Sequence, residues 1–178
     1  MNTDKRDRIV PYLQRLFRYA WSLTKADDKA QDLVQDAARK VLSAGYAPID
    51  EAAYRAWLFK ILRNQFLDDQ RHAGVMDRHA AEIDGADSDF MEYWAGDERL
   101  INKIAVKRAL ATLPPKYAEI LMLIDMAGLS YREASDVFGV PVGTVMSRLS
   151  RARAVLLKVL ESDSGNVVDL SARRTRRG

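Results

Sequence analysis

The stretch LSYREASDVFGVPVGTVMSRLSRAR, residues 129–153, predicts two helices joined by a tight turn. Ser130 and Glu133 have the spacing of a capping box, in which each side chain bonds the other residue's backbone N–H at a helix start. Gly139 is expected to end this helix, because glycine adopts the left-handed conformation of a helix C-terminus at little cost. Pro141 suits the first turn of the next helix. Together these signals predict a helix-turn-helix.

The second helix of this stretch carries hydroxyl and arginine side chains. Such side chains can reach base edges in the major groove of DNA or bond its phosphates. The sequence leaves open which arginines read bases and which hold phosphates. An ordinary helical hairpin with a solvated basic face is the alternative, but the combined capping, turn and arginine signals favour DNA binding. The candidate DNA-binding residues are Thr144, Ser147, Arg148, Arg151 and Arg153.

The chain has 178 residues, of which 48% are hydrophobic and 30% are charged. This length suits one ordinary domain or two small ones, and the apolar content is high enough to bury a core. Charge is spread unevenly, since residues 73–98 hold one basic and eight acidic side chains between two more basic blocks. Basic blocks suit a polyanionic partner, which an acidic connector would avoid or imitate; a plain solvated linker is an equal alternative.

Several classes of function are disfavoured by what the sequence lacks. Without cysteine there are no disulfides, thiol nucleophiles or thiolate metal sites. The two histidines have no metal-like partner pattern, and there is no glycine-rich phosphate loop, so we expect no metal, no cofactor and no enzyme activity. No signal peptide is apparent and no run approaches the roughly 18 apolar residues of a membrane span, which predicts a cytoplasmic protein without membrane insertion.

Apolar residues recur at helical spacing along nearly the whole chain, and no stretch alternates with period two. We therefore expect an all-α fold of two small helical domains joined by a flexible acidic linker, with the helix-turn-helix in the C-terminal domain. The expected domains are residues 1–72 and 99–162, with the linker at 73–98 and a basic, disordered tail at 163–178. The expected helices cover about 9–23, 27–42, 53–71, 100–110, 115–127, 131–138 and 142–160.

The third of these helices interleaves aromatic and basic residues. Its polar side includes Lys60, Arg63 and Asn64, which suit single-stranded DNA because basic side chains neutralise the backbone beside unstacked bases. The preceding loop, with Tyr46 and Tyr54 at its edges, could hold a flipped base. From these residues alone, a solvated surface helix is the commoner explanation.

The second predicted helix carries a polar stripe that includes Asp32, Gln35 and Asp36. Such a stripe could dock on a partner helix through pairs with arginine. Simple solubility explains the same pattern equally well.

Three stretches together resemble the extracytoplasmic-function (group four) sigma factors of bacterial RNA polymerase, in the sigma-70 family. They are KADDKAQDLVQDAARKVL, AYRAWLFKILRNQFLDDQR and LATLPPKYAEILMLIDMAGLSYREASDVFGVPVGTVMSRLSRARAVL, in the order and spacing of that family. The resemblance covers about residues 9–72 and 99–160. It implies an alternative sigma factor that directs core polymerase to particular promoters in a stress or environmental response. It also implies control by an anti-sigma factor.

The resemblance also implies roles for the candidate residues. The first domain is expected to dock on the coiled-coil of the largest polymerase subunit, to melt the promoter and to capture bases of the minus-10 element. The second domain is expected to read the minus-35 element near the flap region of the polymerase. The implied core-binding residues are Asp32, Gln35 and Asp36. The implied minus-10 residues are Lys60, Arg63, Asn64, Tyr46 and Tyr54, and the implied minus-35 residues are Thr144, Ser147, Arg148, Arg151 and Arg153.

Two other functions stay open. A stand-alone helix-turn-helix regulator would bind DNA as a dimer, and nothing in the first domain resembles a dimer seam or an effector pocket. A sigma-mimicking adaptor would sequester an anti-sigma factor without touching promoters. It would be expected to lose the basic residues of the helix that reads the minus-35 element and of the helix that melts the minus-10 element. The chain keeps these basic residues, which favours a sigma factor: Lys60, Arg63, Arg148, Arg151 and Arg153.

Overall fold

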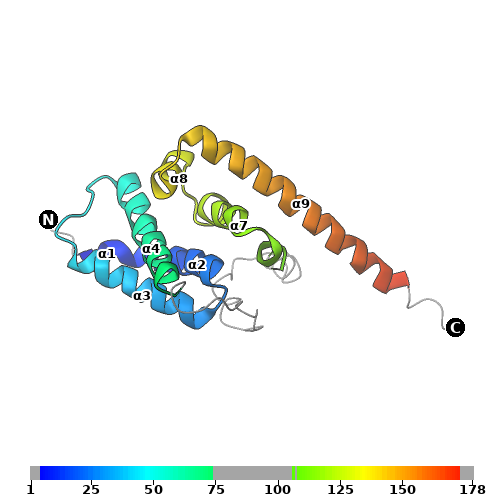
Figure 1. Cartoon of the computed structure of the whole chain (residues 1–178), viewed down its shortest axis with the longest axis horizontal. Helices are drawn as coiled ribbons and strands as arrows, with labels where there is room; N and C mark the ends of the chain where they lie inside the picture. The colour runs from blue at the N-terminus through cyan, green and yellow to red at the C-terminus, as the bar shows by residue number, and fades with distance from the viewer. Residues whose placement is uncertain (1–4, 74–105, 107, 173–178) are drawn as a thin grey trace.

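The computed structural model describes residues 5–73, 106 and 108–172. Within these ranges every regular element is a helix, which confirms the predicted all-α fold (Figure 1). The N-terminal unit, residues 5–73, contains α1 (Lys5–Ile9), the 3-10 turn η1 (Val10–Tyr12), α2 (Leu13–Thr24), α3 (Asp27–Ser43) and α4 (Glu51–Ala73). The C-terminal unit, residues 108–172, contains helical residues 108–112, α7 (Pro115–Leu121), the π-helical turn η2 (Met122–Met126), α8 (Tyr131–Phe138) and α9 (Val142–Ala172).

The first helix predicted, 9–23, differs from the structure at its start. Pro11 has no N–H to donate to a helical ladder, and it lies in the 3-10 turn between α1 and α2. Helical structure begins earlier than predicted, at Lys5. At the other end, Lys25 adopts the left-handed conformation with φ 57° and its N–H bonds the Trp21 carbonyl, which terminates α2.

The core of the N-terminal unit forms where α2, α3 and α4 turn their apolar stripes toward one another. The helical spacing of the sequence predicts these stripes, and the structure confirms them. Burying each valine, leucine or phenylalanine side chain in this core stabilises the fold by roughly 1.5–3 kcal/mol. The core side chains include Leu16, Phe17, Ala20, Leu33, Ala37, Val41, Leu58, Phe59 and Leu62.

The C-terminal unit begins its main helix as the sequence predicts, with Pro115 in the first turn of α7. The predicted helix 115–127 is not uniform, because its last turn widens into η2, where the Ala127 N–H bonds the Met122 carbonyl at 2.8 Å. Gly128 then takes a positive φ of 72°, which only glycine adopts readily, and the chain turns toward α8.

The last helix, α9, is longer than the predicted 142–160 and runs on to Ala172, away from the rest of the molecule (Figure 1). Residues 163–172 of the predicted tail are therefore part of α9. No proline interrupts this part of the chain, and the single Gly165 costs only about 1 kcal/mol relative to alanine. The basic end of the tail, 173–178, lies outside the described residues.

The two units pack against each other. α4 lies along α8, and α2 contacts α7 and η2 (Figure 1). Buried side chains from both units belong to one continuous hydrophobic cluster. The predicted linker, 73–98, lies outside the described residues apart from Ala73, which ends α4. The sequence predicts two units but not this contact between them. None of the described helices is long and apolar enough to cross a membrane.

Candidate nucleic-acid interface

The predicted helix-turn-helix is formed by α8 and α9. Ser130 Oγ accepts the Glu133 N–H at 3.2 Å and the Glu133 carboxylate accepts the Ser130 N–H at 2.7 Å, which confirms the capping box. Gly139 adopts the left-handed conformation, with φ 66° and ψ 36°, and its N–H bonds the Ser135 carbonyl. The Ser135 hydroxyl donates to the Val140 carbonyl at 2.5 Å. These bonds within the turn hold α9 at a fixed angle to α8.

One side of α9 is buried against α7 and α8 through Val145, Leu149 and Ala152. Most of the predicted DNA-binding residues lie away from this side. Ser147 and Arg151 are exposed, whereas Thr144 and Arg148 are half-buried. Spacings of three and four residues place all four along one face of the helix, next to the turn. The structure therefore brings together the hydroxyl and guanidinium groups that the sequence singles out.

Arg153 is the exception among the predicted minus-35 residues. Its Nε and Nη2 bond the two carboxylate oxygens of Asp125 at 3.1 and 2.5 Å. The hydrogen bond to Asp125 raises the pKa of the Arg153 guanidinium. This bidentate pair fastens α9 to η2, so Arg153 has a structural partner within the C-terminal unit. DNA would have to compete with Asp125 for it.

The polar face of α4 separates the three residues that the sequence groups together. Lys60 and Asn64 are exposed one turn apart, so they share a face. Arg63 points elsewhere: its Nε donates to the Glu119 carboxylate of α7 at 2.7 Å. Its guanidinium also lies 5.2 Å from the ring centroid of Phe138, on α8. The structure therefore places Arg63 in the contact between the two units.

The two tyrosines predicted to hold a flipped base have opposite environments. Tyr46, in the loop between α3 and α4, is 71% exposed. Tyr54 is only 1% exposed, because its position in α4 faces the core together with Leu58 one turn later. The Arg8 guanidinium covers the Tyr54 ring at 3.8 Å, and burial raises the pKa of the Tyr54 phenol. The prediction that Tyr54 contacts a base is therefore corrected to a core role.

The predicted docking residues share the outer face of α3. Asp32 and Gln35 are exposed, while Asp36 is half-buried and forms an ion pair with Arg39 one turn later. Leu33 faces the core on the opposite side. Across the described parts of the chain, no group of three or more metal-ligating side chains is arranged to hold a metal ion.

Comparison with known proteins identifies both units. Residues 9–74 match the family model for sigma-70 region 2, and residues 103–156 match the model for sigma-70 region 4. Over 158 residues the chain is 33% identical to the ECF RNA polymerase sigma factor EcfG of Rhodopseudomonas palustris (strain TIE-1), covering 89% of this chain and 86% of that protein. The chain belongs to the ECF sigma factors.

Other relatives of this sigma factor agree. It is 30% identical over 147 residues to the RNA polymerase sigma factor SigV of Bacillus subtilis (strain 168), covering 81% of this chain and 83% of that protein. Its structure is similar to the sigma factor RpoE from Bartonella quintana, solved in complex with the anti-sigma factor NepR. The two share 30% sequence identity with a TM-score of 0.65, over 89% of this chain and 97% of that one.

In this sigma factor, region 2 and region 4 meet at a half-buried carboxylate. Glu119 of α7 is 14% exposed, and a single oxygen of its side chain accepts the Tyr19 hydroxyl at 2.8 Å and Arg63 Nε at 2.7 Å. Burial, followed by the charge and hydrogen bond of Glu119, raises the pKa of Tyr19 well above its usual value. Because Tyr19 is completely buried, its hydroxyl depends on this acceptor from the other unit.

A second polar contact joins the units at the helix-turn-helix itself. One oxygen of Glu133 caps α8, and the other accepts Arg55 Nε of α4 at 2.7 Å. The sequence predicts the capping role of Glu133 but gives no sign of Arg55, which is 78 positions away. Sequence reasoning missed Glu119 for the same reason, because its partners lie in the other unit.

Proposed function

We propose that this chain is an alternative sigma factor that binds core RNA polymerase and directs it to start transcription at particular promoters. The observation that carries the proposal is the presence of region 2 and region 4 in one chain, each with its own exposed polar face. Two small binding units gain affinity and specificity when a scaffold fixes the distance between them. Core polymerase is that scaffold in the proposal, and the chain itself acts by binding rather than by catalysis.

Region 4 is the reader of the minus-35 element in this proposal. The start of α9 enters the major groove, where Thr144, Ser147, Arg148 and Arg151 reach base edges and phosphates. Met146, which is 51% exposed near the same end of α9, offers an apolar contact for a thymine methyl group. Contacts to phosphate position the helix without choosing a sequence, so affinity falls steeply with salt.

Region 2 is the unit that opens and holds the minus-10 element. Lys60 and Asn64 lie along the exposed face of α4, where they suit the backbone of an unpaired strand. Tyr46, in the loop before α4, offers an exposed ring on which an unstacked base can lie. The face of Asp32, Gln35 and Asp36 is then free to bind the coiled-coil of the largest polymerase subunit.

In the structure region 2 packs against region 4, and we call this the closed arrangement. It bears directly on when promoter binding happens. Arg63 is bonded to Glu119 of region 4, so it reaches promoter DNA only when the two units separate. We place this separation at the binding of core polymerase, with region 2 on the coiled-coil and region 4 near the flap region. A partner that holds the units together would keep Arg63 away from DNA. An anti-sigma factor is such a partner, and the sigma factor RpoE of Bartonella quintana was solved bound to one.

Run-off transcription with core polymerase and a promoter library tests the proposal. The wild-type chain is expected to give transcripts from a defined subset of promoters. The double variant Arg148→Ala with Arg151→Ala should lose these transcripts while it still binds core polymerase. Lys158→Ala, which removes an exposed charge further along α9, is the matched control and should behave like wild type.

The same experiment separates the two rival functions. Transcription that is unchanged in the double variant would favour an adaptor that does not touch promoters. Equal retardation of promoter DNA with and without core polymerase would favour a stand-alone regulator.

A further inference from the structure

The loop between α3 and α4, residues 44–50, presents large apolar side chains to solvent. Tyr46 is 71% exposed and Ile49 is 93% exposed. Isolated apolar side chains on a surface are ordinary, but here two occur within four residues on one short loop. The loop leads directly into α4, whose exposed face carries the proposed minus-10 residues. A ligand with a flat apolar surface would find two contact groups at this end of the helix.

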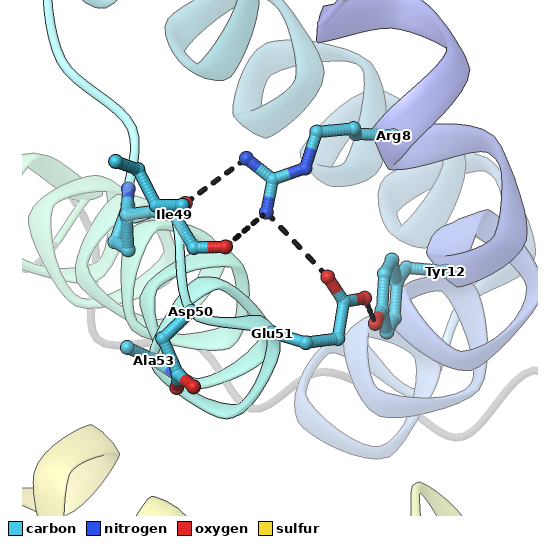
Figure 2. Close-up of polar contacts among 7 residues, drawn as sticks. Arg8, Tyr12, Ile49, Asp50, Glu51 and Ala53 are labelled. Atoms are coloured by element: carbon cyan, nitrogen blue, oxygen red, sulfur yellow. Dashed lines mark hydrogen bonds and ion pairs between the residues drawn. The ribbon is translucent and has the colours of Figure 1, made fainter. Parts of the chain in front are cut away.

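The end of this loop is held by an arginine from a distant part of the chain. Figure 2 shows Arg8 of α1 reaching across to the loop and to the start of α4. Arg8 Nη1 donates to the Pro48 carbonyl at 2.9 Å, and Nη2 is 3.4 Å from the Ile49 carbonyl. Nη2 also lies 3.5 Å from the Glu51 carboxylate. One guanidinium therefore engages two successive backbone carbonyls and the first side chain of α4.

Arg8, which we call the loop anchor, is itself contacted from two sides. Beneath it, the Arg8 guanidinium lies 3.8 Å from the ring centroid of the buried Tyr54. The other oxygen of Glu51 accepts the Tyr12 hydroxyl, so both oxygens of the carboxylate that faces Arg8 have a partner. Asp50 caps α4 by accepting the Ala53 N–H at 2.8 Å. Residues 48–51 are thus held by side chains of α1 and η1 and by a backbone N–H of α4.

This anchor is separate from the side chains that would meet DNA. Arg8 is 25% exposed and is directed at backbone carbonyls, whereas Tyr46 and Ile49 are turned to solvent. A planar guanidinium can donate to several acceptors in fixed directions, and it can also stack on an aromatic ring. A lysine ammonium at the same place keeps the charge but offers neither the fork nor the flat face.

We propose that Arg8 is a positioning residue for the minus-10 element, because it holds loop 44–50 so that Tyr46 and Ile49 can receive an unstacked base. The inference rests on the proposed function, in which this loop faces the melted promoter. Extruding a base costs a few kcal/mol, which stacking on aromatic or apolar side chains offsets. Side chains that are already held in place bind more tightly, because less conformational entropy is lost on binding. Arg8 supplies the rigidity, and the exposed tyrosine and isoleucine supply the surface.

The experiment measures base preference rather than activity alone. Holoenzyme made with each variant is tested on promoters that carry all four bases at each minus-10 position. The readout is the ratio of initiation from the best and the worst base. Arg8→Lys is expected to lower this ratio at one position by about tenfold, the scale of one lost base contact, and Tyr46→Ala should lower it at the same position. Core binding and thermal unfolding are measured for every variant.

The possible outcomes distinguish a failure of the Arg8 role from a failure of the proposed function. An Arg8→Lys holoenzyme that keeps the wild-type ratio overturns the positioning role. Equal loss of initiation on every promoter does the same, because a merely structural role predicts it. A wild-type holoenzyme without any base preference at the minus-10 element overturns the proposed function and this inference with it. A companion variant, Arg8→Ala, removes both the guanidinium and its charge. Lys158→Ala removes one exposed positive charge from α9 and controls for that change in charge.

Discussion

Replacing Glu119 by alanine is expected to loosen the contact between region 2 and region 4. The Tyr19 hydroxyl would lose its acceptor while it stays completely buried, and an unsatisfied buried group costs about 1–3 kcal/mol. Arg63 would lose its carboxylate, but at 21% exposure it can turn toward water, so its loss adds only about 1 kcal/mol. A total near 3 kcal/mol shifts the equilibrium between closed and open forms by about 100-fold.

Because the chain has no cysteine, two labels can be placed without side reactions. Gln31→Cys on α3 and Lys158→Cys on α9 are exposed positions in the two units. Energy transfer between dyes on these positions reports the separation of the units, and a urea titration finds the midpoint of opening. Glu119→Ala should open at clearly lower urea than wild type while circular dichroism still shows folded helices.

Two further variants sharpen the reading. Glu119→Gln keeps the side-chain volume and one acceptor oxygen, so its effect should be smaller than that of alanine. Asp125→Ala removes a carboxylate that pairs with Arg153 inside region 4, and it should leave the separation of the units unchanged. If the opening curve of Glu119→Ala lies within about 0.5 kcal/mol of wild type, Glu119 does not hold the units together and the reasoning is refuted.

Three other predictions follow from the same structure. Gly139→Ala should destabilise the chain by about 1–2 kcal/mol, because alanine strains at φ 66° although no atom crowds the site; thermal unfolding checks this, and Gly139→Asn should cost less. Reversing the charge of the predicted docking face of α3, with Asp32→Lys and Asp36→Lys, should abolish co-purification with core polymerase. The same variant should retain the wild-type DNA affinity of the free chain, because the DNA-reading residues of region 4 are unchanged. Alkaline pH should destabilise the fold, because burial and the bond to Glu51 raise the pKa of Tyr12 to about 12 while the unfolded phenol titrates near 10. The contribution of Tyr12 to the free energy of unfolding is fully present below about pH 10, and it falls by up to about 1.4 kcal/mol per pH unit as the pH rises toward the folded pKa. Urea unfolding across this range should show a shallower fall in stability for Tyr12→Phe.

The sequence alone determined the features that depend on neighbours in the chain. Apolar residues at helical spacing set the helices, and Ser130, Glu133 and Gly139 set the turn geometry of the helix-turn-helix, because capping and φ preference act within a few residues. The exposed face of α9 follows from the same periodicity. The C-terminal end of α9 was not predicted, because a helix without a strong stop signal ends where small differences in free energy decide.

Only the tertiary structure decided how the two units use their charges. Arg63 and Glu119 are 56 positions apart, and nothing local in the sequence distinguishes an arginine that faces water from one that bonds another unit. The same holds for Tyr46 and Tyr54, which are alike in chemistry but differ in burial because only one of them faces the core. Contacts between distant segments leave no periodic trace in a sequence, so the closed arrangement and the Arg8 anchor appear only when the chain is folded.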